Sequence, residues 1–187
     1  YDFYVQQICL SGDTSSWTGV YTFTTQCSSP TTTTCSNIYV STTGAAANAG
    51  TKSSPVTLYE AIKRAACNNT VIKIATGQYL LDSALNISSY LTLEGGFIES
   101  ANWTKTSQAG ATILYRTSNG PTGTPYLNQR LTAIEAVNVT DFRLQDLSIG
   151  VTDAPNFSSI STCAIYLNNA SDYNLVRLQV NAGNGGS

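Results

Sequence analysis

Apolar and polar residues alternate in short runs through the C-terminal half of the chain, and these runs repeat. Residues 134–151 (IEAVNVTDFRLQDLSIGV) align with residues 165–182 (IYLNNASDYNLVRLQVNA) after a shift of 31 positions. The shift also superimposes the residues between the strands: Asn138 on Asn169, Asp141 on Asp172 and Phe142 on Tyr173. A fixed internal period of this kind is typical of a solenoid, in which each repeat buries its apolar face against its neighbours.

The apolar runs are rich in Leu, Ile and Val and lack helical periodicity, which predicts a parallel β-helix with one repeat per coil. Each repeat reaches Asn-x-Ser/Thr at its bend, and a weaker copy (NISSY, then LTL) begins at Asn86. Asn suits a bend because it tolerates a left-handed backbone and its amide can bond to the next Asn in a stack. We therefore predict a structural Asn ladder made of Asn86, Asn138 and Asn169.

More strands and a single helix are predicted ahead of the repeats. The helix is expected at about residues 55–66, with an apolar stripe of Leu58, Ile62 and Ala65 and with Ser54 or Thr57 as its cap. At this place it would cover the open end of the stack and its unpaired strand edges. Strands are expected at 38–41, 71–75, 78–81, 91–97 and 111–116, and a projecting loop at 117–128.

The first 27 residues carry a different pattern. Residues 1–8 and 20–25 alternate as two half-buried strands, which we interpret as the last hairpin of a β-sandwich. The following segment, SSPTTTTCS, is an extended linker. We therefore expect an all-β chain with the end of a sandwich at 1–27, a Thr-rich linker at 28–36 and the start of a parallel β-helix at 37–187. Both ends look cut, so we expect a piece of a longer protein.

Charge is scarce in this chain. Charged residues make up 11% of it and the net charge is -2, so we expect neither a face for nucleic acid nor a polybasic membrane patch. The sequence also lacks a run of 18 apolar residues that could span a bilayer. Thr, Ser and Asn supply most of the polarity, which favours β-structure with a neutral, hydroxyl-rich surface.

The five cysteines include no CxxC pair, and the sequence contains no histidine, so we expect no metal site. Disulfides of an oxidising compartment are the better interpretation. Cys9 and Cys27 flank two consecutive strands and form one natural pair, whereas Cys35 and Cys67 flank the next strand and helix and form a second. Cys163 lies in an apolar strand and is expected to be a buried thiol. The sequence leaves the connectivity open.

Two stretches support a resemblance to known families. The segment IYVSTTGAAANAGTKSSPVTLYEAIKRA, followed by IKIATGQYLL and LNISSYLTLEGGFIESANWTKT, resembles the start of a pectate-lyase-like right-handed parallel β-helix. The preceding YDFYVQQIC…GDTSSWTGVYTFTTQC resembles the closing strands of fibronectin type III-like modules in secreted proteins of Bacteroidota. Together they are similar to giant repetitive surface adhesins exported by the type IX secretion system.

The resemblance implies an extracellular segment at the cell surface, a stiff stalk that presents contact loops in surface attachment or gliding motility. It implies no cofactor and no catalysis in this segment. Its expected partners are the secretion or gliding machinery, other surface proteins, or glycans and surfaces. The motif Asp82-Ser83-Ala84 resembles a short O-glycosylation motif of Bacteroidota, which makes Ser83 a candidate acceptor.

Two other functions remain open. A polysaccharide lyase or glycoside hydrolase on the same scaffold would need converging carboxylates, sometimes with a basic residue. The candidates are Asp141, Asp146, Asp153, Asp172, Arg143 and Arg177. We instead expect the two repeated aspartates to stack at turns and Asp146 to pair with Arg177 at the surface. A carbohydrate-binding module would expose Trp103, Tyr115 and Tyr126, which we interpret as core or loop packing.

Six Asn-x-Ser/Thr sequons occur in the chain. They would indicate heavy glycosylation in a eukaryotic secreted protein. Three of them are the predicted ladder residues, so we interpret those as structural. The sequons begin at Asn68, Asn86, Asn102, Asn138, Asn156 and Asn169.

Overall fold

The computed structural model describes most of the chain from Ser36 onward and two short strands before it. The described residues are 2–3, 21–22, 36–65, 70–106, 108, 110–124, 127–156 and 158–186. In the N-terminal part, β1 (Asp2–Phe3) pairs antiparallel with β2 (Tyr21–Thr22). The predicted fibronectin type III-like sandwich is not shown by this single pair, and the Thr-rich linker up to residue 35 lies outside the described residues.

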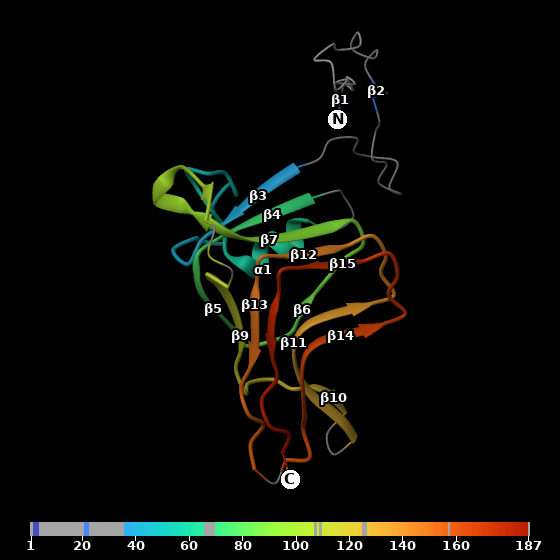
Figure 1. The fold of residues 1–187 in the computed structure, drawn as a ribbon. Coiled ribbons are helices and arrows are strands. Elements are labelled where there is room, and N and C mark those ends of the chain that lie inside the picture. The colour runs from blue at the N-terminus through green and yellow to red at the C-terminus, as the bar shows by residue number, and fades with distance from the viewer. Residues whose placement is uncertain are drawn as a thin grey trace, which may run out of the picture.

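From Ser36 the chain winds into a parallel β-solenoid of about four turns, which confirms the predicted stacking of parallel strands (Figure 1). Three sheets run along the stack; each complete coil supplies a strand to each sheet, whereas the last coil supplies strands to the first two. The first sheet has the order β15-β12-β7-β4-β3, the second β16-β13-β9-β5, and the third contains β11 between β6 and β14. The main neighbours in all three sheets are parallel.

The strands are short, as the alternating runs predicted. The first sheet is built from β3 (Ser36–Val40), β4 (Thr70–Ala75), β7 (Leu91–Ile98), β12 (Arg143–Gln145) and β15 (Asn174–Val176). The second is built from β5 (Gly77–Leu81), β9 (Thr112–Arg116), β13 (Ser148–Val151) and β16 (Gln179–Asn181). The third is built from β6 (Leu85–Asn86), β11 (Leu127–Val137) and β14 (Ser161–Asn168).

Two hairpins extend outward from the coils. β8 (Thr104–Lys105) folds back antiparallel on β7, after the 3-10 helix η1 (Glu99–Ala101). β10 (Thr122–Thr124) pairs antiparallel with the start of β11. The predicted loop at 117–128 is therefore partly a β-hairpin, because the strand of the next coil begins earlier than the apolar pattern indicated.

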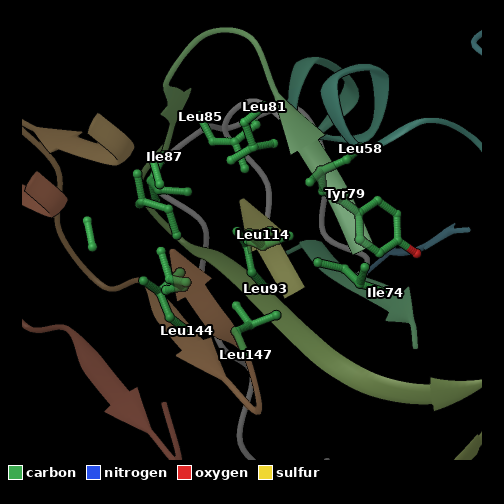
Figure 2. Close-up of a cluster of buried hydrophobic side chains, with 14 of the residues drawn as sticks. Leu58, Ile74, Tyr79, Leu81, Leu85, Ile87, Leu93, Leu114, Leu144 and Leu147 are labelled. Atoms are coloured by element: carbon green, nitrogen blue, oxygen red, sulfur yellow. The ribbon is translucent and has the colours of Figure 1, made fainter. Parts of the chain in front are cut away.

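The helix α1 (Leu58–Arg64) lies at the predicted place, but it begins three residues later and ends two residues earlier than predicted. Its cap is Thr57, whose side chain accepts from the Glu60 backbone N–H at 3.4 Å. Leu58 and Ala61 are buried in the main core. Figure 2 shows Leu58 beside Tyr79 of β5. The helix thus covers the apolar interior at the start of the stack.

The core is a column of aliphatic side chains with one layer per coil. Leu93 and Leu144 lie opposite each other on neighbouring strands of the first sheet, one coil apart, and Leu114 comes from the second sheet. All three are fully buried, and Figure 2 shows them in the same interior. In the last coil the equivalent side chains are uncovered: Leu175 is 43% exposed, whereas Leu144, its partner on β12, is 0% exposed. A coil therefore depends on contacts from both neighbours for full burial.

Removal of a core layer should destabilise the stack far more than removal of the same side chain from the surface. We expect Leu144→Ala to lower the free energy of unfolding by about 2–5 kcal/mol, because it leaves a cavity between two coils. The matched control is Leu80→Ala, since Leu80 is 61% exposed; its effect should stay within about 0.5 kcal/mol. Urea unfolding followed by circular dichroism measures both, and equal losses would contradict the stacked core.

Candidate functional site

The bends between the third and first sheets stack in the predicted way in the last two coils. Asn169 Nδ2 donates a hydrogen bond to Asn138 Oδ1 at 2.9 Å. Both residues have a left-handed backbone, with φ of 48° and 55°. The side-chain bond therefore links two coils at a position where most residues are strained.

Asn86 does not extend this ladder. It pairs with Glu135 of β11, three positions before Asn138. The coils also differ in length here: six steps lead from Asn86 to Thr92, and eight lead from their partners Glu135 to Arg143. The shorter bend has no position equivalent to Asn138, so the sequence similarity at NISSY placed Asn86 in the wrong register.

Hydroxyl and carboxylate groups continue the stack beyond the Asn pair. Ser171 Oγ donates to Thr140 Oγ1 at 3.0 Å, and Thr140 Oγ1 contacts Asp172 Oδ2 at 3.2 Å. Asp141 and Asp172 both have positive φ, at 55° and 51°. These two aspartates are turn residues at equivalent corners of adjacent coils. Beside them Phe142 and Tyr173 stack, with ring centroids 5.4 Å apart.

The bend between the first and second sheets carries an ion pair, as the sequence predicted. Arg177 donates to Asp146 at 2.5 Å from Nε and at 2.8 Å from Nη2. Lys105 Nζ lies 2.7 Å from Asp146 and 2.7 Å from Glu94. Unlike the exposed pair that was expected, Asp146 is buried, at 7% exposure. Hydrogen bonds from Arg177, and further ones from Lys105 and Gln145, hold the pKa of Asp146 well below its usual range.

The remaining enzyme candidates do not converge on a groove. Asp153 Oδ1 accepts from the backbone and side chain of Asn184, again 31 residues away. Arg143 Nε donates to Gln145 Oε1 at 2.7 Å. In the part of the chain that the structure describes, no group of three or more His, Cys, Asp or Glu side chains is arranged to hold a metal ion. The acidic residues act as contacts between successive coils.

Sequence reasoning missed the buried Arg116 at the base of the β10 hairpin. Its side chain donates to four backbone carbonyls: Thr132 at 3.0 Å, Leu81 at 3.1 Å, Thr117 at 3.0 Å and Gly120 at 2.7 Å. Burial lowers the pKa of its guanidinium. Arg116 is fully buried and is the last residue of β9, TILYR. In the sequence, its place at the end of an apolar strand is the signal that could have identified it. Arg116 fixes the loop that leaves the coil at residue 117.

A pocket of about 210 Å³ lies between α1 and β5, lined in part by Thr57, Tyr59 and Leu80. The Tyr59 hydroxyl donates to the Ser83 carbonyl at 2.8 Å and accepts from its N–H at 3.0 Å. Ser83 is exposed in the adjoining turn, so its hydroxyl is accessible to solvent. The neighbouring Asp82 accepts from Asn119 and Thr117, and these hydrogen bonds lower its pKa.

The structure leaves the predicted disulfides undecided, because Cys9, Cys27, Cys35 and Cys67 lie outside the described residues. Cys163, on the strand β14, forms no disulfide within the described residues and is half-buried rather than buried.

The aromatic residues considered for carbohydrate binding have different surroundings. Trp103 is packed, at 6% exposure, and Tyr115 is half-buried. Tyr126 lies outside the described residues.

Comparisons of the chain with models of protein families, with curated proteins and with solved structures found no match. Among the described helices, none has the length and apolar character needed to cross a membrane.

The left-handed bend gives a test of the ladder at Asn169. We expect Asn169→Ala to lower the free energy of unfolding by about 1–2 kcal/mol, because alanine is strained at positive φ and cannot bond to Asn138. Asn169→Gly removes the same hydrogen bond without the strain, so it should cost less. Thermal unfolding of both variants separates the two contributions. A glycine variant as unstable as the alanine variant would contradict the strain argument.

Low pH should lower the free energy of unfolding through the ion pair at Asp146. Its folded pKa is lowered, so the stability it contributes is full above the unfolded pKa of about 3.9 and is lost as pH falls below it. We expect Asp146→Asn to cost about 1–3 kcal/mol at pH 7 and progressively less toward pH 2.

The matched control is Asp141→Asn, which makes the same change at an exposed left-handed corner. It leaves the Asp146–Arg177 pair in place, so it should cost less at pH 7 than Asp146→Asn does. If Asp146→Asn cost the same at pH 7 and pH 2, the ion pair would not be what stabilises this corner.

Proposed function

We propose that this chain is a segment of a cell-surface adhesin or filament, in which a rigid β-solenoid stalk presents contact loops in attachment or gliding motility. The observation that carries the proposal is the stack of parallel coils, from which the β8 and β10 hairpins extend. The proposal includes an extracellular location, export by a type IX system and partners among surface proteins, glycans or the gliding machinery. It also includes a fibronectin type III-like module before a right-handed, pectate-lyase-like solenoid.

The coil contacts support a stiff rod. Between the last two coils, backbone pairing in all three sheets is reinforced by side-chain contacts in the bends, namely Asn138 with Asn169, Thr140 with Ser171 and Asp146 with Arg177. Bending the rod would require these bonds to lengthen together on one side. A rod of this kind keeps its outer loops at fixed positions.

The base of the β10 hairpin supports a presenting role. Loops of surface proteins carry contacts when a rigid scaffold positions them. Arg116 binds Thr117 and Gly120 on the loop and Thr132 on the following strand, so both ends of the projection are tied to one buried side chain. The loop is therefore held to the stalk on both sides.

Surface exposure can be tested on intact cells that make the whole protein. Antibodies raised against residues 36–186 should label unpermeabilised cells, and brief protease treatment of those cells should remove the label. A cytoplasmic protein serves as the control for cell integrity. Label that appears only after permeabilisation would overturn the surface location and, with it, the adhesin proposal.

Catalysis on a glycan is the competing function, and a product assay distinguishes it. The purified chain should release neither reducing ends nor unsaturated products from polyuronides and neutral polysaccharides. Cleavage that is lost in Asp153→Asn or Arg143→Gln, but kept in Asp141→Asn, would overturn the stalk in favour of an enzyme.

A further inference from the structure

A small apolar cluster lies on the outside of the first sheet, separate from the main core. It consists of Ala75, Phe97 and Trp103, with Tyr39 packed against it. Tyr39 and Trp103 meet edge to face, with centroids 4.8 Å apart, and Trp103 Nε1 donates to the Lys52 carbonyl at 3.1 Å. The hairpin from β7 to β8 thus folds its aromatic residues onto the outer face of the coils.

Lysines alternate with these rings. Lys52 Nζ is 6.0 Å from the centroid of Tyr39, and Lys73 Nζ is 5.8 Å from the same ring and 5.5 Å from Phe97. Lys105 Nζ is 4.6 Å from Phe97. We name this arrangement the lysine–aromatic row; its members are Lys52, Tyr39, Lys73, Phe97 and Lys105. Cation–π attraction holds ammonium groups near rings without neutralising them.

Two of the three lysines keep their charge available. Lys105 is neutralised by Glu94 and Asp146. Among the described residues, no carboxylate lies within ion-pair distance of Lys52 or Lys73. Glu94, which lies opposite Lys73 on the neighbouring strand β7, is itself paired with Lys105. Lys52 and Lys73 therefore form a local positive site on a chain whose net charge is -2. Arg143, outward on β12 of the same sheet, adds a third cation whose Nε bonds only to Gln145.

The rings themselves exclude one class of polyanion. Single-stranded nucleic acid binds where bases can stack on open aromatic faces. Here Phe97 and Trp103 are buried, at 7% and 6% exposure, and the lysines lie over the rings. A ligand of this row is therefore bound through regularly spaced negative charges and hydroxyl groups, not through flat bases.

We propose that the lysine–aromatic row is a binding site for an acidic polysaccharide, whose sulfate or carboxylate groups pair with Lys52 and Lys73. The inference names a ligand class for the surface segment proposed above and rests on that function for its biological setting. Two lysines give weak binding per site, so useful affinity comes from many charges on one polymer or many copies of the segment. Salt weakens the binding because the lysines face solvent.

The experiment measures binding of the purified chain to immobilised polysaccharides by biolayer interferometry. Polygalacturonate supplies carboxylates, dextran sulfate supplies sulfate esters, and dextran is the neutral control. Binding to one or both acidic polymers is expected at 20 mM salt, with little binding to dextran. The stronger of the two identifies the anion.

The variants assign the binding to the row. Lys52→Gln with Lys73→Gln should weaken it about 20-fold, since a lysine near an anionic surface contributes about fivefold in affinity. Lys73→Gln alone is compared with Lys63→Gln, which removes the same charge from an exposed position on α1. Circular dichroism and urea unfolding confirm that each variant is folded.

Equal weakening by Lys63→Gln, equal binding to dextran, or tighter binding to single-stranded DNA than to either acidic polysaccharide would overturn the site. The outcome is independent of where the protein resides in the cell. If the chain binds no acidic polysaccharide, the proposed surface stalk is not contradicted. If the protein lies inside the cell, the measured affinity for the polysaccharide is not contradicted.

Discussion

Parallel backbone pairing between coils is the interaction on which the rest of this structure depends. Every strand of the last two coils pairs with its equivalent 31 residues away, in all three sheets. Parallel strands can stay in register only if each coil returns to the same place after one circuit. The bends make this possible, because three left-handed positions recur at equivalent points of the last two coils: Asn138, Asp141 and Asp146, then Asn169, Asp172 and Arg177.

The same constraint explains why polar side chains at the corners are structural. A left-handed L-residue costs about 1–2 kcal/mol, and the side-chain contacts between coils offset part of this cost. Close approach adds to the constraint: a Cβ on Gly95 would lie 2.4 Å from the Asp146 carbonyl oxygen of the next coil. Acidic residues that resemble a catalytic set in sequence are therefore used where the chain bends.

The sequence predicted the solenoid well because its period, strand alternation and helix cap are local signals. Asn138 and Asn169 could be paired from spacing alone, and so could Asp146 and Arg177. Asn86 could not, because the two extra residues of the later bend are invisible until the strands on both sides are in register. The lysine–aromatic row could not be predicted from the sequence either, because Tyr39, Lys73 and Phe97 come from three coils. Lys105 reaches Phe97 only in the folded hairpin.

The unequal coil lengths have a consequence for how such a protein can diversify. The offset between neighbours is 31 residues in the last coil but 51 between β7 and β12, because that circuit includes the hairpins after β7 and before β11. An added or deleted residue within a strand would reverse every later side chain, inside to outside. The same change at a hairpin tip would leave the register untouched. The hairpins can therefore become longer during evolution while the strands of each coil keep their pairing. New binding specificities can arise in this way without a change in the solenoid fold.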